Sequence, residues 1–302
     1  MASKMLTGDM PELMENILKH LSNEIYSLYS AVRKFILNGD DCSSEFYGII
    51  SALESQKNTL QEVILEGCVF SAEFEVLNNC KNLDTLRIFD CDTELLKILD
   101  YNNISTLEIY QYPIYVPIIV PILEKVGKLL QRLKFETNVV IWEETLFLET
   151  LKSFCPNIIY LCISDIGLST QLIELIGNLQ KLQFLSLGHT YHKPKYEREI
   201  RVMQFAKILP STLQYLDIPG TLLDSFIGIL LDHCNAPLKK LLISNVRLND
   251  EENTKALIRY CTRIRTLNYV GIVKYHVLGN DIRNELKKFV TLAPYELIVV
   301  NC

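Results

Sequence analysis

Apolar residues recur along this chain in groups of three with the spacing L-x-x-L-x-L. In the stretch CKNLDTLRIFDC the group is formed by Leu83, Leu86 and Ile88. The nine groups of this kind begin at Leu60, Leu83, Ile104, Leu130, Ile158, Leu182, Leu213, Leu238 and Ile264. In each group the last two apolar positions flank a single residue that is free to differ. This alternation is typical of a short strand with one buried face.

Successive groups begin 21 to 31 residues apart, which indicates a repeat architecture. Helix-like segments fill the gaps, and two of them, TQLIELIGNLQ and DSFIGILLDHC, carry apolar residues at i, i+3 and i+4. One strand and one helix cannot bury a core alone, so neighbouring repeats must stack. We therefore predict an α/β solenoid with short parallel strands on the concave face and helices on the convex face.

Each strand contributes one variable residue to the concave face, between its two buried positions. Stacked parallel strands would align these residues in a row: Ile64, Arg87, Glu108, Lys134, Cys162, Ser186, Asp217, Leu242 and Asn268. Flanking positions add Phe89, Tyr110, Arg132, Tyr160, Phe184 and Tyr215. Aromatic residues mixed with both signs of charge suit a protein partner, although an ordinary solvated face also carries single apolar residues. The residues that we expect to bind a partner are Arg87, Phe89, Lys134, Tyr160, Phe184, Tyr215 and Asp217.

Six of the nine cysteines hold fixed places in the repeats. They precede the first apolar anchor of a group by three or four residues or follow the last anchor by three: Cys80, Cys155, Cys234, Cys261, Cys68 and Cys91. A pair around one group is compatible with a disulfide, a metal clip or a redox pair, but the recurring phase favours buried thiols that fill small spaces. The layout C-x-x-L-x-x-L-x-L-x-x-C resembles the cysteine-containing subclass of leucine-rich repeats, which implies a leucine-rich-repeat solenoid.

A short amphipathic helix is expected before the repeats, in GDMPELMENILKHL. Asp9 can cap this helix, and Pro11 is tolerated in its first turn. One apolar stripe then runs along it, formed by Leu13, Ile17, Leu18 and Leu21. A plain amphipathic cap for the solenoid would carry a similar stripe.

The same residues resemble an F-box. Met10-Pro11-Glu12-Leu13, followed by Ile17-Leu18 and Leu21, is similar to the opening of that motif, and SLYSAVRKF is similar to its next segment. The run Val32-Arg33-Lys34-Phe35 is shorter than the corresponding run of the family. The resemblance, to F-box/leucine-rich-repeat proteins of the fungal type, implies a helical F-box-like segment over 1–38 and the solenoid over 39–302. It also implies binding to the Skp adaptor of a cullin-RING (SCF) ubiquitin ligase through Pro11, Leu13, Ile17, Leu18 and Leu21.

The net charge and the apolar segments disfavour nucleic acid and membranes as partners. The formal charge of -6 gives no basic excess for nucleic acid. The N-terminus lacks the apolar region of a signal peptide. The most apolar run, PIYVPIIVPILEKV, contains three prolines and is shorter than the roughly 20 residues that span a bilayer. We expect no membrane partner and a cytoplasmic or nuclear location.

No catalytic or phosphate-binding motif is present. His189 and His192 lie close together in a charged stretch but lack further ligands, so we predict no metal, no cofactor and no enzymatic activity. The closing stretch YELIVVNC is a candidate for a last strand through Leu297 and Val299. The leading interpretation is a substrate-recognition subunit of an SCF-type ligase whose concave face binds an unidentified target protein. The alternative is a leucine-rich-repeat interaction scaffold with a degenerate F-box and no ligase role.

Overall fold

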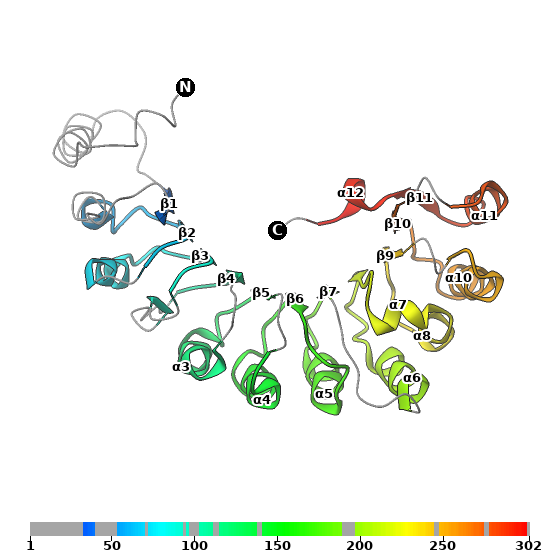
Figure 1. Ribbon diagram of the computed structural model, residues 1–302, viewed down its shortest axis with the longest axis horizontal. Coiled ribbons are helices and arrows are strands. Elements are labelled where there is room, and N and C mark those ends of the chain that lie inside the picture. Colours follow the sequence, from blue (N-terminus) through cyan, green and yellow to red (C-terminus); the bar gives the residue numbers. More distant parts are fainter. Residues whose placement is uncertain are drawn as a thin grey trace, which may run out of the picture. The chain divides into compact units, whose positions relative to one another are not determined.

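The computed structural model alternates short strands with helices along the chain (Figure 1). The residues that it describes are 33–39, 53–69, 72–92, 95–96, 103–110, 115–137, 141–188, 197–244, 248–274 and 278–300. The chain divides into two compact units, Met1–Arg132 and Leu133–Cys302.

The first unit contains four strands that pair in parallel and in chain order. They are β1 (Lys34–Asn38), β2 (Glu62–Glu66), β3 (Thr85–Phe89) and β4 (Thr106–Tyr110). The register places Val63 opposite Leu86 and Leu86 opposite Leu107, so equivalent positions of successive repeats lie side by side. A 3-10 helix, η4 (Ala72–Asn79), links β2 to β3, and α3 (Val116–Val126) follows β4.

The second unit continues the alternation, beginning with β5 at the boundary between the units. Its strands, also neighbours in chain order, are β5 (Arg132–Glu136), β6 (Tyr160–Ser164), β7 (Phe184–Gly188), β8 (Tyr215–Asp217), β9 (Lys240–Ser244), β10 (Tyr269–Val273) and β11 (Thr291–Pro294). Its helices are α4 (Glu144–Phe154), α5 (Thr170–Asn178), α6 (Arg198–Ile208), α7 (Leu222–Ser225), α8 (Ile227–His233), α10 (Glu251–Ile264), α11 (Asn280–Leu286) and α12 (Tyr295–Ile298). Within this unit, the longer helices lie on one side of the strands (Figure 1).

The apolar groups form the core, as the sequence predicted. All anchors of the first eight groups, from Leu60 to Ile243, are at most 1% exposed. The helices α5 and α8 fall within the two helix-like segments and bury their apolar faces, Leu172 and Ile176 on the first and Leu230 and Leu231 on the second. Parallel strands in repeat register, backed by helices, confirm the leucine-rich-repeat α/β solenoid.

The ninth group is a correction to our prediction. We assigned Ile264, Leu267 and Tyr269 to it, but Tyr269 is 42% exposed. The hydrogen-bond register pairs Val270 with Leu241 and Ile272 with Ile243. The group therefore consists of Leu267, Val270 and Ile272, which satisfies the same spacing three residues later.

Both ends of the repeat region also differ from the expected arrangement. Phe35 and Leu37 of β1 stand opposite Val63 and Leu65, so the sheet begins at Lys34, inside the range 1–38 that we assigned to helices. The other residues of that range lie outside the described residues. At the far end the last strand is β11, whereas Leu297, the candidate strand residue, lies in α12 and is 75% exposed.

One buried hydroxyl ties α10 to the segment that enters β9. Tyr260 is fully buried, and its hydroxyl donates to the Ala236 carbonyl (2.5 Å) and accepts the Leu238 N–H (3.2 Å). Tyr260→Phe leaves both backbone groups without this partner, and we expect it to lower the free energy of unfolding by about 1–3 kcal/mol. Chemical denaturation measures the loss. Tyr269→Phe, on an exposed ring, is the matched control, and an equal effect of the two substitutions would contradict the prediction.

Candidate functional site

The variable positions of neighbouring strands lie side by side on the concave face, as expected. In the first unit the register aligns Ile64 with Arg87 and Arg87 with Glu108. Phe89 stands opposite Tyr110 at the end of the same strands. The predicted row is therefore present in this unit.

Arg87, a predicted partner-binding residue, is held by two carboxylates of its own sheet. Its Nε lies 3.4 Å from Glu62 Oε1 and 3.5 Å from Glu108 Oε2. Glu62 also pairs with Lys34 at 3.2 Å. Glu108 is buried, and its pairing with the guanidinium offsets part of the cost of burying its charge. This cluster carries two positive and two negative side chains and so presents no net charge.

An aromatic ladder crosses three strands of the second unit. Tyr160 of β6 stands opposite Phe184 of β7, and Phe184 stands opposite Tyr215 of β8. The ring centroids are 6.2 Å apart for the first pair and 5.7 Å for the second, within the range of favourable ring contacts. All three rings were predicted as partner-binding residues, and the structure brings them together.

The neighbouring row of the second unit runs from Cys162 through Ser186, Asp217, Leu242 and Gly271 to Ala293. Gly271 takes the place that we had assigned to Asn268, because the ninth group lies three residues later. The row is therefore polar over β7 and β8 and apolar over β9 to β11.

Residues 295–300, here named the return segment, fold back onto this row. Ile298 packs in one cluster with Tyr215 and Leu242. Tyr295 donates a hydrogen bond from its hydroxyl to Asp217 Oδ2 at 3.1 Å, and the Val300 N–H donates to the Tyr215 hydroxyl at 3.2 Å. The concave face over β8 to β10 is thus already covered by a segment of the same chain.

We expected this row to be exposed, but part of it is buried beneath the return segment. Leu242 is 0% exposed, Tyr215 2% and Asp217 5%, although Leu242 and Asp217 occupy variable positions and Tyr215 a flanking position of their strands. Tyr160 is also buried, beside the ring of Phe184. The sequence held one signal of this cover, namely the apolar Leu242 that follows the polar Ser186 and Asp217 in the predicted row.

Asp217 is the most perturbed carboxyl of this face. Burial raises the pKa of Asp217 to about 6, and the hydrogen bonds from Tyr295 and Ser186 oppose the rise. The Ser186 hydroxyl donates to Oδ2 at 3.1 Å. The other oxygen, Oδ1, is buried and accepts no hydrogen bond from the described residues. Burial also raises the pKa of Tyr295, so its phenol remains a proton donor at neutral pH.

The remaining predicted site residues are only partly placed. Lys134 of β5 pairs with Glu136 of the same strand at 3.0 Å, and Phe89 is half-buried. The predicted adaptor-binding residues, Pro11, Leu13, Ile17, Leu18 and Leu21, lie outside the described residues, as do His189 and His192. Over the described ranges, no three His, Cys, Asp or Glu side chains are grouped to hold a metal ion.

The cysteines act as repeat fillers, as predicted. All six are buried and none forms a disulfide, although Cys261 lies six residues before Leu267, the first anchor of the corrected ninth group. Burial raises the pKa of Cys155 to about 12 and that of Cys234 to about 11, which suppresses the reactive thiolate. The Cys91 sulfur accepts the Cys68 N–H at 3.3 Å and so joins two repeats.

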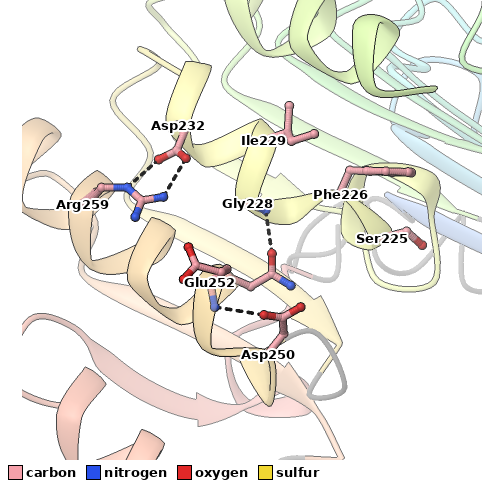
Figure 2. Close-up of a pocket in the computed structure, with 9 residues that line it drawn as sticks. Ser225, Phe226, Gly228, Ile229, Asp232, Asp250, Glu252 and Arg259 are labelled. Atoms are coloured by element: carbon pink, nitrogen blue, oxygen red, sulfur yellow. Dashed lines mark hydrogen bonds and ion pairs between the residues drawn. The ribbon is translucent and has the colours of Figure 1, made fainter. Parts of the chain in front are cut away.

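A pocket of about 280 Å³ lies between α8 and α10 (Figure 2). Arg259 Nη2 and Asp232 Oδ2 approach to 2.7 Å within it, and Asp250 accepts the Glu252 N–H at 2.9 Å. The Gly228 N–H donates to the Asn253 amide oxygen at 3.1 Å. These bonds join consecutive repeats and cap α10, so we interpret the pocket as a junction between helices and assign it no ligand.

Comparison with known proteins shows similarity to solved structures only. No family model matches the sequence, and no curated protein matches it. A protein from Bacteroides fragilis is 14% identical over 93% of this chain and 81% of its own, with a TM-score of 0.50. The leucine-rich-repeat protein LegL7 from Legionella pneumophila is 11% identical, covering 88% of this chain and 99% of its own, with a TM-score of 0.47. The Rad7 and Elc1 complex from yeast gives 12% identity over 96% of this chain and 89% of that chain, with a TM-score of 0.43.

These identities are low, so the likeness concerns the fold alone. No described helix combines the length and the apolar composition needed to cross a membrane. The leucine-rich-repeat fold is one that binds proteins through the extended surface its stacked repeats create.

Proposed function

We propose that this chain is the substrate-recognition subunit of an SCF-type ubiquitin ligase, without catalytic activity of its own. In this role the residues that precede the sheet bind the Skp adaptor, and through it cullin, while the concave face of the repeats binds a target protein. The same role places the chain in the cytoplasm or the nucleus.

The observation that carries the target-binding half is the aromatic ladder of Tyr160, Phe184 and Tyr215 with the carboxylate of Asp217 beside it. Tyr215 and Asp217 become available to a target when the return segment that covers them is displaced. Aromatic rings on rigid strands supply large contact areas at a small loss of conformational entropy, and such residues are enriched at protein interfaces. The charged cluster around Arg87 balances both signs of charge, which suits a protein better than a polyanion.

The adaptor-binding half rests on the sequence. Met10-Pro11-Glu12-Leu13 with the stripe of Ile17, Leu18 and Leu21 resembles the opening of an F-box. An apolar stripe on a helix needs a partner surface, which the adaptor would provide.

One observation favours the second candidate function, a repeat scaffold with no ligase role. Lys34 and Phe35 belong to the run that resembles the end of the F-box segment, yet they form part of β1. Their use in the sheet leaves fewer residues for the F-box-like helices. A segment shortened in this way would lose contacts with the adaptor.

A pull-down with the purified Skp adaptor tests the ligase role. We expect the wild-type chain to bind the adaptor and the double variant Leu13→Asp/Leu18→Asp to lose at least tenfold in affinity. The physical reason is that two charges on the apolar stripe oppose its burial, at a cost of about 1 kcal/mol or more for each.

The matched control makes the same two changes at exposed leucines, as Leu129→Asp/Leu146→Asp. The control should retain adaptor binding. Absence of wild-type binding, or equal binding by the Leu13→Asp/Leu18→Asp variant, would exclude the ligase role and leave the scaffold function.

A further inference from the structure

The return segment fits the concave face by shape. A Cβ atom on Gly271 would lie 2.7 Å from Ile298 Cδ1 and 3.0 Å from Leu242 Cγ, closer than packed carbon atoms approach. Glycine on β10 therefore leaves the space that the Ile298 side chain fills. Leu242 forms the floor of this recess and is fully buried beneath it.

Hydrogen bonds fix the orientation of the same segment. The Tyr295 hydroxyl donates to Asp217 Oδ2, which also accepts the Ser186 hydroxyl, and the Tyr215 hydroxyl accepts the Val300 N–H. The face thus combines an apolar recess with a carboxylate acceptor, and the return segment reaches the two with Ile298 and Tyr295, which lie one helical turn apart.

The return segment is only weakly attached to the sheet. Its helix α12 has four residues, too few to be stable without the contacts that it makes. Leu297 is 75% exposed, and Tyr295, Val299 and Val300 are half-buried. By contrast, β11 is paired with β10 in register. Opening of the return segment breaks its contacts with β8 to β10 and leaves the pairing of the strands intact.

We propose that the concave face over β8 to β10 is a peptide-binding site that the return segment occupies in cis. Its partner is a protein segment that forms one helical turn and presents a tyrosine three residues before a branched aliphatic residue. This segment displaces the return segment when it binds. The inference rests on the target-binding half of the proposed function and is independent of adaptor binding.

A synthetic peptide tests the site directly. The probe is a fluorescent, end-blocked peptide of sequence YELIVVN, which repeats residues 295–301, and its binding is followed by fluorescence anisotropy. In the full chain, Ile298→Asp removes the apolar anchor and releases the return segment. We expect this variant to bind the probe at least tenfold more tightly than the wild-type chain, because a tethered competitor acts at an effective concentration of about 1 mM.

Two matched controls isolate the contacts. The full-chain variant Leu297→Asp changes an exposed residue of the same helix and should bind the probe as weakly as the wild-type chain does. A peptide with phenylalanine in place of the tyrosine lacks the donor to Asp217 and should bind the Ile298→Asp variant roughly tenfold more weakly. Failure of the folded Ile298→Asp variant to bind the probe, or equal binding of the two peptides, would overturn the proposal.

Hydrogen exchange on the wild-type chain keeps the test decisive if Ile298→Asp does not fold. We expect the Val300 amide to exchange at least a hundredfold faster than the amides of β9 and β10, through local opening. Equal rates would mean that the segment is a fixed part of the core, and the proposal would fail. Adaptor binding by Ile298→Asp should remain unchanged, so failure here and failure of the ligase role are separately visible.

Discussion

Asp217→Asn is expected to stabilise the protein at pH 8 by up to about 3 kcal/mol and to change its stability little near pH 4. Burial raises the pKa of this carboxyl from the ordinary 3.8 to about 6. A shift of about 2 pH units corresponds to a cost of roughly 3 kcal/mol for keeping the ionised form folded. Asparagine carries no charge, and its oxygen can still accept the hydrogen bonds from Ser186 and Tyr295.

The sign of the pH dependence follows from proton binding. Between about pH 4 and pH 6 the folded chain holds a proton on Asp217 that the unfolded chain has released. The contribution of Asp217 to stability therefore falls as the pH rises through this window and is constant outside it. The negative charge of Glu136 adds to the rise in the pKa of Asp217, and the phenols of Tyr215 and Tyr295 oppose it.

Urea denaturation of the wild-type chain and the variant at pH 4, 6 and 8 measures this effect. Asp281→Asn, which removes a negative charge from the exposed surface of α11, serves as the control and should show no step of this size. A stability difference that is the same at pH 4 and pH 8, or a loss of stability at pH 8, would contradict the buried, charged state of Asp217.

Most of the core could be predicted because the L-x-x-L-x-L spacing reflects strand geometry directly. Alternate residues of a strand point to opposite faces, so two apolar anchors around one variable residue define both the strand and its buried side. This reasoning placed β2 to β9 correctly. It failed to place β1, where Phe35 and Leu37 have the same spacing but were read as part of the F-box resemblance.

For the candidate face, only the alignment of residues into rows across neighbouring strands could be predicted. Stacked parallel strands bring Tyr160, Phe184 and Tyr215 together, as the spacing of their groups required. The return segment was not predictable, because a four-residue helix is too short to show a periodic pattern. Its contact with Asp217 spans 78 residues of sequence, and no local rule specifies such a pairing.

The last prediction concerns the ninth group, which lies three residues later than the sequence indicated. The loss of stability that we expect from a substitution there depends on the strand register. Both Ile264-Leu267-Tyr269 and Leu267-Val270-Ile272 satisfy the repeat spacing, and only the pairing of β10 with β9 decides between them. Ile272 is 0% exposed, so Ile272→Ala should lower the free energy of unfolding by about 2–5 kcal/mol, from lost burial and the cavity that remains.

Tyr269→Ala provides the matched comparison, on the opposite face of the same strand. Tyr269 is 42% exposed in this register, and its truncation should cost no more than about 1 kcal/mol, although the tyrosine is the larger side chain. Urea denaturation of both variants measures the difference. The opposite order, with Tyr269→Ala the more damaging change, would place Tyr269 in the core and restore the group that the sequence first indicated. Because β10 contributes Gly271 to the recess beneath Ile298, that result would also displace the recess and remove the site proposed for the return segment.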